Sequence, residues 1–218
     1  MFASYARKDL AILSLVLVLL GTVALWLFWP VVVIPVGLFA LILWFFRDPE
    51  RETPTEEGVL VSPADGTIQD IEVVREDTFL DEEALRIGIF MSILSVHVNR
   101  APCSGTVKLV ERSEGAFFNA GVREAIDKNN AVRMGLEIKG GRILVRQVSG
   151  VLARRIVNVC TVGSQIKRGQ RIGMIKLGSR VEVYVARSMS FECRVRVGEK
   201  VKAGVTVLGK LNTAAKQL

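Results

Sequence analysis

The segment Val162-Gly-Ser-Gln-Ile-Lys-Arg-Gly-Gln-Arg-Ile-Gly173 returns 35 residues later as Val197-Gly-Glu-Lys-Val-Lys-Ala-Gly-Val-Thr-Val-Leu208. Both copies fit the pattern V-G-x-x-[IV]-K-x-G-x-x-[IV], in which glycines flank a short β segment. Glycine adopts the backbone angles that tight turns need, and alternation along a strand points isoleucine or valine inward and lysine outward. Two copies are too few for a solenoid. The repeat therefore predicts two equivalent hairpins in a pseudo-symmetric β structure.

The remainder of residues 47–218 is also rich in β-forming sequence. Short runs of Val and Ile, separated by turn residues, predict strands. The predicted strands are 58–62, 67–74, 85–90, 95–99, 105–110, 143–148, 156–159, 181–185 and 193–197. Helix is scarce: one is predicted over 120–128 with Asn119 as its cap, and a second near Arg154 and Arg155. We therefore predict a mainly β fold (α+β) that resembles the barrel-sandwich hybrids of biotinyl and lipoyl carrier domains, an architecture that by itself fixes no chemistry.

The N-terminal part has a different character. Residues 11–46 of the 218-residue chain are 36 residues without one ionisable side chain. A single helix of this length would measure about 54 Å, against a hydrocarbon core of about 30 Å. Pro30 and Pro35 interrupt the run, so we predict a transmembrane helical hairpin, 11–29 and 31–46, within a membrane anchor of residues 1–46. One span followed by a shallow re-entrant segment, and a single span with the globular part outside, are the alternatives.

Charge is divided unevenly along the chain, whose formal net charge is +7. Residues 47–138 hold 10 Lys and Arg against 18 Asp and Glu, whereas residues 139–218 hold 17 against 3. A basic half beside a membrane anchor favours anionic lipid headgroups, at about 1 kcal/mol per well-placed cation. Nucleic acid is the competing interpretation, but all three Trp lie in the apolar run and no aromatic platform accompanies the basic residues, so we predict no nucleic-acid partner. Basic residues also flank both ends of the apolar run, which predicts that the domain 47–218 lies on the cytoplasmic side of the cell membrane.

Cysteine and histidine usage limits the chemistry. Cys103, Cys160 and Cys193 are widely spaced and form no C-x-x-C pair, so neither a disulfide framework nor a thiolate zinc site is indicated. His97 is the single histidine, which excludes a multi-histidine metal centre, and we predict no metal. Any imidazole chemistry must use His97.

Two segments place polar side chains at strand ends. In Val61-Ser-Pro-Ala-Asp-Gly-Thr67 a tight turn presents Asp65 at the start of a strand, which is also the pattern of an ordinary Asx turn. In Met91-Ser-Ile-Leu-Ser-Val-His-Val-Asn-Arg-Ala-Pro102, alternation puts His97 and Asn99 on one face, and Arg100 lies where the strand must stop. A lone histidine is more often structural than catalytic, but the polar and cationic neighbours of His97 leave both interpretations open.

A third segment contains the dipeptide Gly178-Ser179 between two strand-like runs. A serine oxygen next to a peptide carbonyl can attack it where the backbone is strained and a base removes the hydroxyl proton. The plain alternative is a hairpin turn, since Gly-Ser is a common loop dipeptide.

Together these segments resemble the phosphatidylserine decarboxylase family, in its short, single-histidine branch that also includes archaetidylserine decarboxylases. The resemblance covers nearly the whole chain and rests on five motifs in the expected order. These are Phe45-Phe-Arg-Asp-Pro49, Ser62-Pro-Ala-Asp-Gly66, Val96-His-Val-Asn-Arg-Ala-Pro102 followed by Gly105, Gly115-Ala-Phe-Phe-Asn-Ala120, and Leu177-Gly-Ser-Arg180. Each motif is short, yet their common order argues against chance agreement.

The resemblance implies a zymogen that cuts itself between Gly178 and Ser179. The products would be a β fragment, 1–178, and an α fragment, 179–218, held together as a heterodimer, with higher oligomers left open. Ser179 would become a covalent pyruvoyl group that accepts the electron pair left by carbon dioxide, so that no external cofactor is needed. The implied reaction converts phosphatidylserine to phosphatidylethanolamine in phospholipid biosynthesis. Archaetidylserine is the alternative substrate, because both lipids share the serine headgroup.

The resemblance also implies roles for side chains. His97 would protonate the carbon that has lost carbon dioxide, and Asp65 would orient His97 or remove the Ser179 proton during maturation. Longer members of the family carry two histidines in this strand, and Arg100 stands here in place of the second. The division of labour between self-cleavage and decarboxylation is therefore open, and Arg100 is assigned to the lipid phosphate or carboxylate. The predicted substrate-binding residues are Asn99, Arg100, Phe117, Phe118 and Asn119.

The rival from another class is a non-enzymatic, membrane-tethered protein of the biotinyl or lipoyl type, an adaptor or a carrier with Lys176 as its modified lysine. Met-Lys-Met, the neighbourhood expected of a carrier lysine, is absent from the chain. A serine hydrolase is a further rival, but the chain has no G-x-S-x-G. The number of polypeptides separates the two main interpretations, because the decarboxylase must end as two and the carrier as one.

Overall fold

The computed structural model describes residues 7–27, 32–116, 128–150, 155–175 and 178–212. The chain divides into two compact units, Met1–Glu50 and Arg51–Leu218. The predicted helices over 120–128 and near Arg154 lie, except for their last residues, outside the described ranges.

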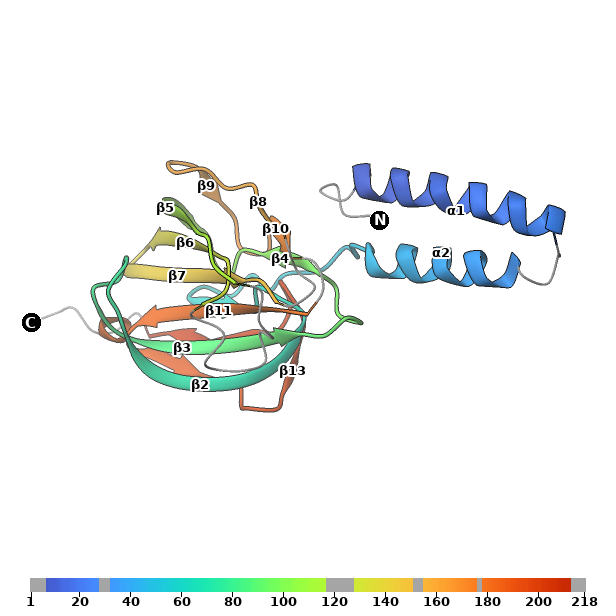
Figure 1. The fold of residues 1–218 in the computed structure, drawn as a ribbon. Coiled ribbons are helices and arrows are strands. Elements are labelled where there is room, and N and C mark those ends of the chain that lie inside the picture. The colour runs from blue at the N-terminus through green and yellow to red at the C-terminus, as the bar shows by residue number, and fades with distance from the viewer. Residues whose placement is uncertain (1–6, 28–31, 117–127, 151–154, 176–177, 213–218) are drawn as a thin grey trace, which may run out of the picture. The chain divides into compact units, whose positions relative to one another are not determined.

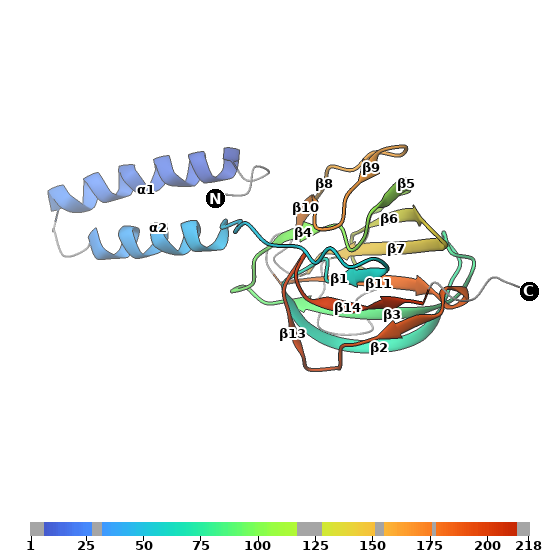
Figure 2. The ribbon, with the colours of Figure 1, turned by 180° about the vertical axis from the view of Figure 1, so that it is seen from behind.

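The first unit consists of two apolar helices, α1 (Arg7–Leu27) and α2 (Val33–Phe45). Within α1, Lys8–Trp26 has a mean hydropathy of 2.3 and is long enough to cross a membrane, whereas α2 is shorter than a full span. The two helices contact each other and run side by side in both views (Figures 1 and 2). They occupy the two segments of the predicted hairpin, and the membrane crossing itself stays a prediction.

The second unit confirms the predicted mainly β fold. Its described residues form three antiparallel sheets, with the strand orders β13-β2-β3-β11-β7-β6-β5-β9, β1-β14-β12 and β4-β10-β8 (Figures 1 and 2). The strands are β1 (Val59–Val61), β2 (Gly66–Glu76), β3 (Glu82–Met91), β4 (Val98–Arg100), β5 (Gly105–Ser113), β6 (Ala131–Ile138), β7 (Gly141–Val148), β8 (Ile156–Asn158), β9 (Gln165–Ile166), β10 (Arg171–Ile175), β11 (Ser179–Ala186), β12 (Phe191–Cys193), β13 (Lys200–Val201) and β14 (Val207–Leu211), with a 3-10 turn at Arg187–Met189.

Most predicted strands are confirmed, and the errors have local causes. The predictions over 95–99 and 193–197 were displaced, since β4 begins at Val98 and β12 ends at Cys193. Strand β6 was missed because its sequence places Arg133, Gly135 and Glu137 among the apolar residues and has few β-branched side chains. It is held from both sides by β5 and β7, so tertiary pairing overrides its weak local preference.

The hydrophobic core lies against one face of the eight-stranded sheet. Val181, Val183 and Val185 of β11 point into it, and Val183 faces Ile87 of β3 and Val145 of β7 in register. Burying each of these side chains contributes about 1.5–3 kcal/mol. Strand β11 is therefore fixed in the middle of the sheet, and its first residue is Ser179.

The two copies of the 35-residue repeat adopt equivalent structures, but the predicted hairpins were wrong, because β9 pairs with β5 and not with β10, and β13 pairs with β2 and not with β14. In the first copy Ile166 is buried and Lys167 exposed, and in the second Val201 is buried and Lys202 exposed. The opening glycines of both copies have φ +89°, and the central glycines have φ +78° and +73°. These left-handed angles explain why both copies keep glycine at the same places.

A second repeat, which the sequence analysis missed, completes the pseudo-symmetry. The segments 62–68 and 101–107 both read x-P-x-x-G-T-[IV]. The residue before each segment donates to the proline of the other: the N–H of Val61 donates to the Pro102 carbonyl, and the N–H of Arg100 donates to the Pro63 carbonyl, each at 2.9 Å. Each segment also accepts a bond from the central glycine of one copy of the 35-residue repeat, Gly204 or Gly169. The pseudo-twofold arrangement thus joins the predicted site segments at the centre of the fold.

Candidate active site

The dipeptide Gly178-Ser179 lies where the chain passes from one sheet to another. Strand β10 pairs with β4 and β8, and β11 pairs with β3 and β7. The hairpin-turn interpretation was therefore wrong, because the strands on either side of the dipeptide do not pair with each other. Gly178 has φ +62°, a left-handed conformation that a residue with a Cβ adopts only at a cost.

Ser179 is fully buried and faces Met91, its cross-strand neighbour on β3. Its Oγ donates a hydrogen bond to the Sδ of Met91 at 3.5 Å. The Nδ2 of Asn99 donates to the same sulfur at 3.6 Å. The structure thus brings together two residues from predicted site segments through a methionine that the sequence analysis did not single out.

Asn99 is in turn held by a line of buried amides. Gln147 Nε2 donates to Asn99 Oδ1 at 2.8 Å, and Asn158 Nδ2 donates to Gln147 Oε1 at 2.9 Å. The backbone N–H of Cys160 donates to Asn158 Oδ1 at 2.9 Å. Sequence reasoning missed Gln147 and Asn158, since neither belongs to a recognisable motif.

His97 is fully buried in the segment that joins β3 to β4. Its backbone carbonyl accepts a hydrogen bond from the N–H of Ile175, at the end of β10, at 3.3 Å. His97 is thereby hydrogen-bonded to β10, the strand that leads toward Gly178. In the chain, His97 comes two residues before Asn99.

Asp65 forms an ion pair with Arg51. Its carboxylate binds the Arg51 guanidinium with both oxygens, at 2.5 and 2.8 Å, and accepts a bond from the Ala203 N–H at 2.7 Å. At the pseudo-symmetric position, Ser104 Oγ accepts a bond from the Arg168 N–H at 2.9 Å. The described contacts of Asp65 therefore link its segment to Arg51 and to the second copy of the 35-residue repeat, whereas an Asx turn would have it accept from the N–H of Thr67.

Arg100 is also buried. Its Nη1 donates to the carbonyl of Gly169 at 3.2 Å, and its side chain packs against Gly204, where an added Cβ would come within 2.9 Å of it. The remaining predicted substrate-binding residues, Phe117, Phe118 and Asn119, lie outside the described residues.

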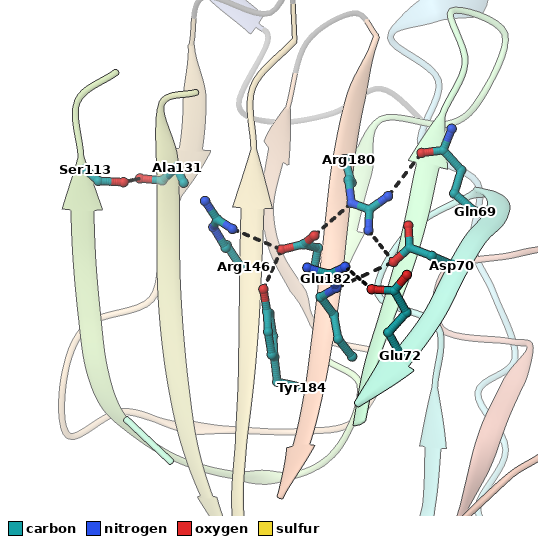
Figure 3. A network of polar contacts seen from close by, with 10 residues as sticks. Gln69, Asp70, Glu72, Ser113, Ala131, Arg146, Arg180, Glu182 and Tyr184 are labelled. Carbon is teal, nitrogen blue, oxygen red and sulfur yellow. Dashed lines mark hydrogen bonds and ion pairs between the residues drawn. The ribbon is translucent and has the colours of Figure 1, made fainter. Parts of the chain in front are cut away.

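On the opposite face of β11, a network of buried charges begins at the residue after Ser179 (Figure 3). Arg180, 1% exposed, binds Glu182 at 2.8 Å, Asp70 at 2.7 Å and Gln69 at 3.1 Å. Because a buried charge is costly unless it is paired, these contacts fix the Arg180 side chain in one position. The network therefore anchors the chain immediately beyond the candidate cleavage point.

The same network continues across the sheet through Glu182. Its Oε2 accepts a bond from Tyr184 at 2.7 Å and lies 3.3 Å from Arg146 (Figure 3). Burial, followed by the negative charge of Glu182, raises the pKa of Tyr184, so this phenol stays a donor across the working pH range. Sequence analysis did not find this network because its members are on β2, β3, β7 and β11 and resemble ordinary solvated charges.

Replacing Gly88 with alanine is expected to destabilise the domain by about 1–3 kcal/mol, as measured by thermal unfolding. A Cβ on Gly88 would lie 1.8 Å from Nη2 of Arg180, which cannot move without breaking its ion pairs. In an Arg180→Ala background the same change should cost much less. Equal costs in the two backgrounds would contradict the packing argument.

Thiol chemistry is disfavoured at two of the described cysteines, Cys103 and Cys160. Burial raises the pKa of Cys103 to about 12 and also raises the pKa of Cys160. A thiol that stays protonated at neutral pH is a poor nucleophile. Ser179 is thus left as the buried hydroxyl that stands next to a left-handed glycine and a line of oriented donors.

Comparison with known proteins gives a consistent result. The family model for phosphatidylserine decarboxylase matches residues 38–209. The phosphatidylserine decarboxylase proenzyme of Symbiobacterium thermophilum is 42% identical over 196 residues, 89% of this chain and 90% of that protein. The corresponding proenzyme of Rhodopirellula baltica is 42% identical over 212 residues, 96% and 88% of the two chains. That of Chlorobium phaeovibrioides is 38% identical over 221 residues, 99% of each.

Proposed function

The chain belongs to the phosphatidylserine decarboxylase family, and we propose that it is a proenzyme that cuts itself between Gly178 and Ser179 and then decarboxylates phosphatidylserine to phosphatidylethanolamine. Family membership makes the protein an enzyme, a carboxy-lyase, and argues against the non-enzymatic carrier. The lysine that the carrier would have modified, Lys176, lies outside the described residues.

One observation carries the cleavage proposal. The candidate scissile bond joins a glycine with φ +62° to a fully buried serine at the start of a central strand. A glycine here permits a backbone turn that exposes its carbonyl, and the burial of Ser179 keeps bulk water away from an ester. The word proenzyme in the relatives' names supports a maturation step.

The proposed cut transfers the Gly178 acyl group from nitrogen to oxygen. The Oγ of Ser179 attacks the Gly178 carbonyl carbon, the C–N bond breaks, and the hydroxyl proton ends on the new amine, which leaves an ester. Elimination then removes the Cα proton of residue 179 and breaks the Cβ–Oγ bond, so that a Cα=Cβ double bond forms and Gly178 departs as a carboxylate. The dehydroalanine left at residue 179 takes up water and releases ammonia, which yields the pyruvoyl group.

The residues around position 179 fit a pyruvoyl group, because Ser179 supplies its carbon atoms in a buried place. The group would supply a carbonyl that takes up the electron pair released with carbon dioxide. The remaining tasks fall to side chains of this chain. His97 gives a proton to the substrate carbon, and Arg100 binds the phosphate or carboxylate of the lipid. Asp65 orients His97 or takes the Ser179 proton, for which it would have to loosen its contact with Arg51.

The proposed substrate is a bilayer lipid, and a membrane-associated first unit would bring the enzyme to it. The hydropathy and length of α1 support membrane association. The basic residues Arg7, Lys8, Arg47 and Arg51 at the two ends of the apolar run support a cytoplasmic position for the catalytic unit. The α and β fragments remain together as a heterodimer.

Intact-mass measurement under denaturing conditions tests the proposal. We expect two polypeptides, 1–178 and 179–218, the smaller with a blocked first residue. A single uncut species of 218 residues that fails to react with carbonyl-trapping reagents would refute it. Assays of the detergent-solubilised protein with phosphatidylserine and with archaetidylserine then identify the preferred lipid.

Removal of residues 1–46 is expected to yield a protein that stays in solution without detergent and cuts itself at the rate of the full chain. The reason is that the unit Arg51–Leu218 contains every described residue of the candidate site. Ultracentrifugation and a time course of cleavage provide the measurement. Loss of processing in the shortened chain would show that the first unit contributes to folding.

A further inference from the structure

The line of amides that ends beside Ser179 has a fixed polarity. A side-chain amide can usually turn by 180° and exchange its oxygen and nitrogen, so a bond between two amides does not set its own direction. A backbone N–H, in contrast, can only donate. The N–H of Cys160 donates to Asn158 Oδ1 at 2.9 Å, which commits the Asn158 Nδ2 to the other side.

This polarity passes from strand to strand. Asn158 on β8 donates to the oxygen of Gln147 on β7, so the Gln147 nitrogen is the group that faces Asn99 on β4. Gln147 donates to the Asn99 oxygen, and Asn99 must then point its own Nδ2 away from Gln147. Gln147 and Asn99 are 1% and 0% exposed, so water does not compete for these bonds.

The Asn99 Nδ2, the last donor in this line of amides, faces a weak hydrogen-bond acceptor. The Asn99 Nδ2 lies 3.6 Å from the Sδ of Met91, and Ser179 Oγ lies 3.5 Å from the same sulfur. A thioether is a poor acceptor, so this N–H is oriented while most of its hydrogen-bonding capacity is unused. Donors held in place before charge develops are effective in catalysis, and removal of one costs about 10²–10³ in rate.

We propose that Asn99 donates this N–H to the oxygen at residue 179 that gains negative charge, and that Gln147 and Asn158 are positioning residues that keep the Asn99 nitrogen, rather than its oxygen, turned toward it. During the cut that oxygen is Ser179 Oγ, which leaves Cβ with the electron pair of their bond. The inference rests on the proposed function, because it concerns the same residue.

Two isosteric changes test the polarity. Asn158→Asp keeps the acceptor for Cys160 but cannot donate, so Gln147 must turn to donate toward it, and Asn99 must turn in response. Gln147→Glu reverses Asn99 directly. We expect each variant to lengthen the half-time of self-cleavage at least about 10-fold. The double variant Asn158→Asp with Asn99→Ala should be no worse than Asn99→Ala alone, because the donor that would turn is already absent.

Gln165→Glu is the matched control, since Gln165 is exposed on β9 and donates to Thr106, and it should cut and turn over normally. Asn99→Ala removes the donor without adding charge and should show the same loss, while Gln147→Met should lose less than Gln147→Glu. Thermal unfolding identifies any variant that is inactive because it does not fold. Normal cutting in Asn158→Asp or Asn99→Ala, or multiplied losses in the double variant, would overturn the inference. A wild-type chain that never cuts itself would instead refute the proposed function.

Discussion

Ser179→Ala is expected to leave the chain as one uncut polypeptide of 218 residues that releases no measurable carbon dioxide from phosphatidylserine. Alanine lacks the oxygen that would attack the Gly178 carbonyl and the leaving oxygen that would create the ketone, so both maturation and turnover lose their chemistry. The fold should persist, because the described bond of this hydroxyl is to a thioether sulfur and its loss costs about 1 kcal/mol or less. Denaturing mass spectrometry and a carbon dioxide assay provide the measurements.

Ser164→Ala is a suitable control for this experiment. Ser164 directly precedes β9, which β5, β6 and β7 separate from β11, and its hydroxyl donates to the carbonyl of Thr161 at 2.7 Å. Loss of its hydroxyl should leave cleavage and turnover unchanged. Full decarboxylation by the Ser179→Ala chain would refute the assignment of the reactive carbonyl to residue 179.

His97→Ala should lower the rate of carbon dioxide release by about 10²–10⁴-fold, the usual contribution of a positioned acid or base. His97 is the single imidazole of the chain and is fully buried close to Asn99 in sequence, so no second histidine can replace it. Single-turnover release of carbon dioxide from matured protein separates this effect from any failure to mature. Added imidazole should restore part of the rate by occupying the space that the missing histidine side chain leaves.

His97→Gln is the informative companion variant. Glutamine keeps a polar side chain of similar reach but cannot exchange a proton near neutral pH, so we expect it to be as slow as alanine. If it instead retained the wild-type rate, His97 would have a structural role and the proton donor would have to be sought elsewhere.

The sequence was a good guide to the fold where local pattern and tertiary structure agree. The 35-residue repeat predicted that its two copies are equivalent, because its glycines have left-handed angles that the pattern itself requires, but it did not reveal that each short strand pairs outside its own copy. It failed at β6, where the strand is stabilised by two neighbours rather than by its own composition. It also failed at Gly178-Ser179, since two adjacent strand-like runs do not reveal that they enter different sheets.

The candidate site was predicted only in part for the same reason. Short motifs contain His97, Asn99 and Ser179, and the structure joins the last two through Met91. The partners of these residues are far away in sequence: Gln147 is 48 residues from Asn99, and Asp70 is 110 residues from Arg180. A glutamine or aspartate in a strand is unremarkable until the register of several strands is known. Asp65 shows the same limit, because its motif does not reveal that its partners are Arg51 and Ala203.

The described part of the last forty residues, 179–212, contributes strands to two of the three sheets of the domain. Strand β11 lies between β3 and β7, β13 pairs with β2, and β14 lies between β1 and β12. After the proposed cut at Gly178-Ser179, these pieces would hold their places without a covalent link, and unfolding would let them diffuse apart. Reassociation of the separated fragments would then depend on their concentration, whereas the intact precursor folds within a single molecule. A matured molecule that is denatured should therefore recover poorly on dilution, so the lifetime of the enzyme is set by how slowly it opens rather than by how well it refolds.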